Sequence, residues 1–177
     1  ATGKKIQNWP ADVLKEGPLK DAYMKWRVEQ ITHLVRLVHE QARPLRPGLK
    51  ISAAVFGAYP QCVQNVGQDW VAWAKAGYVD FISPMDYTDD DAYFTRLVKR
   101  QLELTKGRVL IYPGIGATAS NSALTPDRVI GQIYLAREAG APGFTIFDYT
   151  INTAGSVIPA VGKSAGATKA APVHKEK

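Results

Sequence analysis

Four apolar runs, separated by segments with helical periodicity, dominate the pattern of hydrophobic and polar positions along this chain. The runs are Lys50–Phe56, Val79–Tyr87, Val109–Gly114 and Gly143–Tyr149. Runs of this length without polar alternation are typical of strands covered on both faces. Their alternation with helices indicates parallel pairing through right-handed crossovers, so the pattern predicts an α/β fold.

Start signals place the helices between these runs. The first helix is expected over residues 19–43, and others begin after Gln68 or Asp69, after the carboxylates 89–91 and after Thr125. The spacing of residues 89–91 matches no calcium-binding loop of the EF-hand type, so they are interpreted as helix caps and no metal is expected. Residues 57–67 are expected to form a long loop, of the kind that is often functional at strand ends.

The length of the chain limits how much of a barrel it can form. A (β/α)8 barrel typically needs about 250 residues, and four strand–helix units fill roughly half of that. With 177 residues, 46% of them hydrophobic, the chain can bury one core. We therefore predict a partial barrel over residues 1–159, a fragment or processed product of a longer fold. Residues 160–177, rich in Ala and Lys, are expected to form a disordered tail.

Charge and special segments exclude several functional classes. The net charge is +6, but Lys163, Lys169, Lys175 and Lys177 against Glu176 give half of it to the predicted tail. No basic run is interleaved with aromatic residues, so no nucleic-acid partner is expected. No apolar stretch is long enough to span a membrane, and a signal-peptide core is not seen at the start.

Two carboxylates follow apolar runs directly. In parallel α/β folds the chemistry lies at the carboxyl ends of the strands, and Asp86 and Asp148 both occupy such positions. Burial raises the pKa of a carboxyl group and suits it to act as a general acid, and a pair of carboxylates facing one cavity can hydrolyse a glycosidic bond. The structural alternatives are a turn-forming role for Asp86 and a salt bridge to an arginine for Asp148.

Aromatic residues follow the same strand ends. Tyr59, Tyr87, Tyr112 and Tyr149 are candidates for holding sugar rings, and Trp9 could join them from the N-terminal loop. Each tyrosine alone is also a common packing residue, so the indication comes from the set of four.

A glycine pair after the third run allows a different chemistry. The backbone at Gly114 and Gly116 could approach a phosphate, but the segment lacks the full glycine-rich motif, and a simple loop is the alternative. A sugar-phosphate aldolase would also need a lysine at a strand end, and Lys50 lies at a strand start. No cofactor is expected.

Several segments together resemble the C-terminal half of glycosyl hydrolase-like family 10. They occur in the family's order and are residues 47–56, 68–80, 83–87 and 112–116, within a resemblance that covers about residues 5 to 150. The family's proteins are bacterial, usually exported TIM barrels, which implies the C-terminal half of such a barrel here and a location in the cell envelope or periplasm.

The resemblance also implies missing and additional site residues. A strand ending in an Asp-Tyr-Ile-Arg-Tyr-Pro-like motif, with its carboxylate, is expected upstream of residue 1 in an N-terminal half-barrel that would be this chain's partner. Arg27 opens the helix after that strand, so it is a candidate for orienting a carboxylate. Arg27 and Met85 join the tyrosines as substrate-binding candidates.

These observations favour a glycoside hydrolase that acts on a bacterial polysaccharide or cell-wall glycan. Asp86 and Asp148 are the predicted catalytic residues. A non-catalytic carbohydrate-binding half-barrel is the alternative, and a sugar-phosphate aldolase or isomerase ranks last. Half a barrel exposes two strand edges, so the chain is expected to pair with its N-terminal half or to dimerise.

Overall fold

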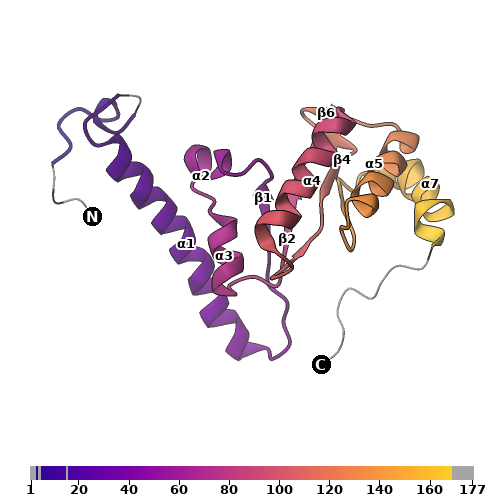
Figure 1. The fold of residues 1–177 in the computed structure, drawn as a ribbon, viewed down its shortest axis with the longest axis horizontal. Helices are drawn as coiled ribbons and strands as arrows, with labels where there is room; N and C mark the ends of the chain where they lie inside the picture. Colours follow the sequence, from indigo (N-terminus) through magenta and orange to yellow (C-terminus); the bar gives the residue numbers. More distant parts are fainter. Residues whose placement is uncertain (1–2, 4, 15, 169–177) are drawn as a thin grey trace.

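The computed structural model describes residues 3, 5–14 and 16–168, and its helices and strands follow one another across the molecule in chain order (Figure 1). The long helix α1 and the last helix α7 therefore lie at opposite ends. The elements are η1 (Ala11–Val13), α1 (Lys20–Leu45), β1 (Ser52–Phe56), α2 (Gln61–Val66), α3 (Trp70–Ala76), β2 (Phe81–Met85), α4 (Asp91–Thr105), β3 (Leu110–Ile111), β4 (Gly114–Gly116), β5 (Thr118–Ala119), β6 (Ser122–Ala123), α5 (Pro126–Glu138), β7 (Thr145–Phe147), α6 (Ile151–Gly155), α7 (Val157–Lys163) and η2 (Ala165–Ala167).

The main sheet is parallel and confirms the predicted fold class. Its order is β1-β2-β4-β7, and β3 also pairs with β2. Since Phe81 pairs with Leu110 and Met85 with Gly114, β3 and β4 occupy successive parts of one strand position. Each of the four strand positions coincides with one of the four apolar runs, and helices alternate with them. This is the arrangement of half a (β/α)8 barrel.

The hydrophobic core lies between the sheet and its helices. One buried cluster joins β1 and β2 to α3, where Trp70 and Trp73 are 0% and 2% exposed. A second cluster joins β4 to α4, α5 and α7, with Phe94 and Ile133 fully buried. Helices α3, α4 and α5 thus bury apolar residues in these clusters, whereas α1 has no buried residue and packs partly buried side chains such as Ile31 and Val35 against the first cluster.

The other face of the sheet is open. Alternate residues of β1 and β7 are exposed there, and Phe56 and Phe147 keep 52% and 42% of their surface accessible. The prediction that the strands are covered on both faces is therefore wrong for β1 and β7. In a closed barrel, side chains from the remaining strands fill this inner face.

Most predicted helix starts are confirmed, and two segments differ. Asp69 and Asp90 cap α3 and α4 by accepting hydrogen bonds from backbone N–H groups, and α5 begins after Thr125. Helix α1 extends to Leu45 with Pro44 in its last turn, slightly past the predicted end. The expected loop 57–67 instead contains helix α2.

The C-terminal segment is more ordered than predicted. The disordered tail expected from residue 160 is wrong for residues 160–168, because α7 and η2 continue the fold and bury Val161 and Ala165 in the second core cluster. Residues 169–177 lie outside the described part of the chain. Within that part, no helix combines the length and apolar character needed to cross a membrane.

Candidate functional site

The carboxyl group of Asp86 lies just past the end of β2 and is buried against α4. Its side chain is 1% exposed. The side-chain amide of Gln101 in α4 donates a hydrogen bond of 2.7 Å to Oδ1, and the same Nε2 donates to the carbonyl oxygen of Gly57 at 3.2 Å. Among the described residues, Oδ2 has no hydrogen-bond partner. Oδ1 is thus held by a hydrogen bond, whereas Oδ2 is buried without a described partner.

Burial sets the protonation of this carboxyl group. Removal from water raises the pKa of Asp86 to about 7, and the hydrogen bond from Gln101 opposes the rise only in part. An ordinary aspartate is ionised at neutral pH, whereas Asp86 exchanges its proton near pH 7. A group with this pKa can act as a general acid or base.

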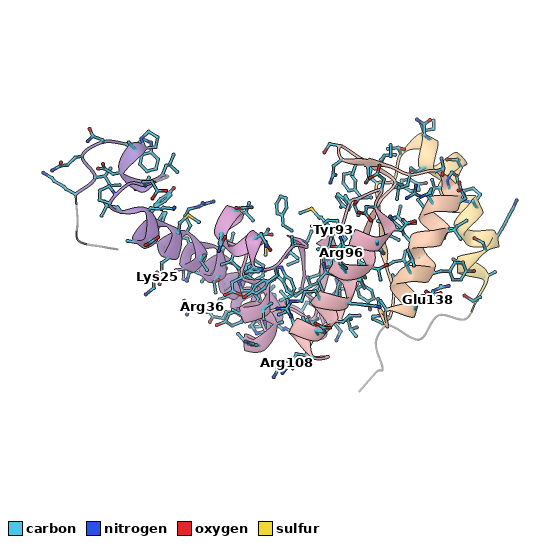
Figure 2. The ribbon with its side chains drawn as sticks, turned by 45° about the horizontal axis from the view of Figure 1, so that its top comes forward. Lys25, Arg36, Tyr93, Arg96, Arg108 and Glu138 are labelled. Carbon is cyan, nitrogen blue, oxygen red and sulfur yellow. The ribbon has the colours of Figure 1, made fainter. Side chains whose placement is uncertain are left out.

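Asp86 lines a pocket of about 240 Å³ at the carboxyl ends of β1 and β2. The remaining lining residues come from the end of β1, from α2, from the end of β2, from α4 and from the β5–β6 turn: Phe56, Gly57, Ala58, Gln61, Cys62, Asn65, Val66, Met85, Tyr87, Tyr93, Leu97 and Asn121. Tyr93 stands at the start of α4 beside Arg96, whose guanidinium carbon lies 5.5 Å from the ring centroid (Figure 2). The pocket therefore brings together three predicted site residues, Met85, Asp86 and Tyr87.

Side chains from the following elements hold the segment after Asp86. The amide of Asn121 donates to the carbonyl oxygen of Tyr87. Gln132 of α5 donates to the carbonyl oxygen of Thr88 at 2.9 Å and to Asp91 at 3.1 Å. Arg128 of the same helix reaches Asp91 at 3.2 Å. These contacts fix the backbone that carries Asp86 and Tyr87.

Asp148 lies in a different environment from Asp86. It follows β7 and accepts a hydrogen bond from the hydroxyl of Thr118, while its own backbone N–H donates to that oxygen at 3.2 Å. It is not among the described residues that line the pocket. The structure therefore does not place the two predicted catalytic carboxylates in one pocket.

Tyr87 is close enough to both carboxylates to interact with their charges. Its ring stacks on Phe147 of β7 at a centroid distance of 5.1 Å. Burial raises the pKa of Tyr87, and the negative charges of Asp86 and Asp148 raise it further. This tyrosine is the described link between the pocket and the end of β7.

Tyr59 and Tyr112 make packing contacts. The hydroxyl of Tyr59 donates to Asp69 at 3.3 Å and its ring packs edge-on against Trp70. Tyr112 is 7% exposed, packs edge-on against Phe81, and has no described partner for its hydroxyl. Their role in sugar binding stays a prediction.

The other candidates lie away from the pocket. Tyr149 is 81% exposed after β7. Trp9 is 65% exposed and packs edge-on against Tyr23 beside α1. Arg27 donates to the carbonyl oxygen of Asn65 at 3.1 Å and so ties α1 to α2, and its described contacts include no carboxylate.

The glycine pair at 114 and 116 belongs to strand β4, so the predicted loop is wrong. Both residues are buried, and their backbone pairs with β2 and β7. A Cβ at Gly116 would lie 2.9 Å from Cβ of Tyr87 and 2.1 Å from Oγ of Ser122. These glycines therefore leave room for neighbouring side chains instead of exposing N–H groups to a phosphate.

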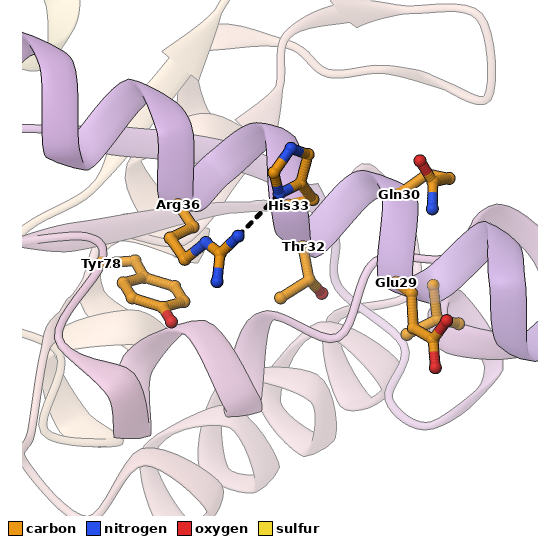
Figure 3. A pocket seen from close by; sticks show the side chains of 7 residues that line it. Glu29, Gln30, Thr32, His33, Arg36 and Tyr78 are labelled. Carbon is orange, nitrogen blue, oxygen red and sulfur yellow. Dashed lines mark hydrogen bonds between the residues drawn. The ribbon is translucent and has the colours of Figure 1, made fainter.

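A second hollow of about 520 Å³ lies along α1. Its lining residues are Val28, Glu29, Gln30, Thr32, His33, Arg36 and Tyr78, and Arg36 donates to Nδ1 of His33 at 2.9 Å (Figure 3). None of the predicted site residues lines it.

Sequence reasoning missed the residues that surround Asp86. Gln101 occupies an apolar stripe of α4, which is an unusual position for an amide and the one available indication of its role. Gly57 and Asn121 lie in turns and give no such indication.

The fold and the site define a class: a parallel half-barrel with a proton-exchanging carboxyl group at the carboxyl ends of its strands, where barrel enzymes carry their active sites. The family model described as Glycosyl hydrolase-like 10 matches residues 9–130, and the chain belongs to this family. The match includes Asp86 and Gln101 and ends before Asp148. Among the curated proteins, none matches the chain.

Proposed function

We propose that this chain forms the acid side of a glycoside hydrolase, with Asp86 as the group that donates a proton to the leaving glycosidic oxygen. The observation that carries the proposal is a carboxyl group with a pKa of about 7 in a residue that lines the pocket, whose Oδ2 is buried without a described hydrogen-bond partner. The family match supports glycosidic chemistry. Proton donation by such a group typically accelerates a reaction by about 10²- to 10⁴-fold.

A glycoside hydrolase needs a second carboxylate besides the acid, and two candidates could provide it. Asp148 is the candidate within this chain, connected to the pocket through Tyr87. The other source is an N-terminal half-barrel, whose strands would face the open side of this sheet. Its carboxylate would complete the pair that glycoside hydrolysis requires.

The pocket supports a carbohydrate as the ligand. Tyr87 and Tyr93 offer aromatic faces, while Gln61, Asn65 and Asn121 offer amide groups for hydroxyl recognition. We propose a bacterial polysaccharide, with cell-wall glycan as the substrate class. Export to the cell envelope stays a prediction from the family.

A non-catalytic carbohydrate-binding half-barrel is the second candidate. It is favoured by one observation, which is that Asp148 does not line the pocket that contains Asp86. Under this proposal the aromatic and amide groups bind glycan and Asp86 has no partner for catalysis.

Turnover of chitooligosaccharides and of peptidoglycan glycan fragments distinguishes the two. We expect reducing-end release by the chain joined with its N-terminal half-barrel, and a loss of about 10²-fold or more in Asp86→Asn. Glu103→Gln, an exposed carboxylate of the same helix as Gln101, is the matched control. If these proteins bind glycan and none of them turns it over, the result would support the non-catalytic binding module instead.

A further inference from the structure

The side-chain amide of Gln101 is fully buried, and only its nitrogen has hydrogen-bond partners among the described residues. Its exposed fraction is 0%, and Nε2 donates both to Oδ1 of Asp86 and to the carbonyl oxygen of Gly57. Its Oε1 has no partner among the described residues. Burying an unpaired amide oxygen is unfavourable, so a purely structural position would favour an apolar residue here.

We propose that Gln101 is a positioning residue that assigns the acidic proton of Asp86 to Oδ2. A neutral carboxyl group carries one O–H, and its carbonyl oxygen is the better hydrogen-bond acceptor. Because the amide of Gln101 donates to Oδ1, that oxygen acts as the carbonyl and the proton resides on Oδ2. The oxygen that holds the proton is thus the one that the described residues leave unbonded.

This arrangement deepens the proposed function and rests on it. When Oδ2 gives its proton to the leaving oxygen, the O–H electron pair stays on the carboxyl group. The negative charge then spreads over both oxygens, and Oδ1 already accepts a hydrogen bond that strengthens with that charge. Gln101 therefore stabilises the conjugate base without competing for the proton.

The absence of a side chain at Gly57 leaves room for the carboxyl group of Asp86 and the amide of Gln101. A Cβ at residue 57 would lie 1.9 Å from Oδ1 of Asp86 and 2.8 Å from Nε2 of Gln101. The carboxyl group and the amide therefore occupy space that any side chain at position 57 would take. The carbonyl oxygen of Gly57 also fixes the amide orientation, because it accepts the second N–H of Gln101.

Titration of Asp86 by carboxyl ¹³C NMR on the full 177-residue chain tests the proposal. The other titratable groups at the pocket are Cys62 of α2, Tyr87 at the end of β2 and Tyr93 of α4. Gln101→Met removes the donor at similar volume, and we expect the Asp86 midpoint to rise by about one pH unit, a tenfold change. Glu103→Gln, at an exposed position on the same helix, is the control and should leave that midpoint in place.

A measurement on the unmodified chain covers the case in which Gln101→Met fails to fold. The side-chain ¹H–¹⁵N resonances of Gln101 should shift with the midpoint of Asp86, and Asp86→Asn should abolish that shift. Gln101 resonances that do not follow Asp86, or an Asp86 midpoint equal in all folded variants, would overturn the proposal. These readouts involve no glycan, so their failure is distinct from a failure of the hydrolase assay.

Discussion

At the scale of single residues, Asp86 should give the protein an unusual pH dependence. Its native pKa of about 7 lies above the ordinary value of 3.8, so the unfolded chain releases this proton first as the pH rises. The contribution of Asp86 to the free energy of unfolding therefore falls between about pH 4 and pH 7, by up to about 4 kcal/mol, and stays low above pH 7.

Urea denaturation at several pH values, compared between the unmodified chain and Asp86→Asn, measures this effect. The variant has no acidic proton at this position, so its stability relative to the unmodified chain should increase from pH 4 to pH 8. A difference between the two proteins that does not change with pH would contradict the raised pKa.

The sequence predicted that Asp86 follows the end of a strand, which the structure confirms, but it did not predict the surroundings of Asp86, and the reason is physical. A carboxylate directly after a buried strand is local information, because strand ends and chain order are sufficient to place it. Gln101 is 15 residues away along the chain, and Gly57 and Gln101 are 44 residues apart. Their contact depends on how α4 packs on the sheet, which periodicity does not specify.

At the scale of elements, Asp80 connects three of them. It precedes β2, accepts a hydrogen bond of 2.7 Å from the backbone N–H of Ile51 and one of 2.9 Å from Arg43 of α1, and lies 4.0 Å from Lys50. Burial raises the pKa of Asp80, but these donors and charges outweigh that effect and lower it below the ordinary value.

We predict that Asp80→Asn destabilises the chain at neutral pH by about 1–3 kcal/mol, because it removes the charge from a part-buried network. The loss should be full above the ordinary aspartate pKa and should fade as the pH falls through the lowered native value. Thermal unfolding at a series of pH values measures it. Glu29→Gln, from the exposed pair with Lys25, should be almost neutral, and an equal effect of both variants would refute this role.

Element prediction succeeded where the pattern is strong and failed where tertiary packing decides. The four apolar runs and the capping residues act locally. The sequence predicted a cap at Gln68 or Asp69 and another among residues 89–91, and the structure shows Asp69 and Asp90 in these roles. Helix α7 buries Val157 and Val161 one turn apart, but two apolar residues in a stretch rich in Ala, Gly, Lys and Ser are too few to predict a helix. Its order comes from packing against α5, which the sequence does not display.

At the scale of the whole molecule, the open sheet should drive association. The exposed rings of Phe56 and Phe147 lie on its inner face, and β1 and β7 are its edge strands. Unpaired edges and exposed apolar faces promote pairing with other strands. We therefore expect the isolated chain to self-associate through this face.

Size-exclusion chromatography with light scattering measures the association. The double variant Phe56→Ser, Phe147→Ser should shift the chain toward monomer, whereas Tyr134→Ser, at an exposed position on helix α5, should not. A cooperatively folded monomer of the unmodified chain would contradict the expectation.

Only one oxygen of the Asp86 carboxyl group is hydrogen-bonded, so selection for folding stability and selection for activity should favour different residues at this position. A library of variants sorted only for folded protein at pH 8 should enrich Asp86→Asn, because the amide avoids a charge buried away from water. Under the proposed function, a library sorted for glycan hydrolysis should lose the same variant. In a relative that is not selected for hydrolysis, the gain in folding stability would therefore favour replacement of Asp86, whereas the aromatic residues of the pocket could be retained.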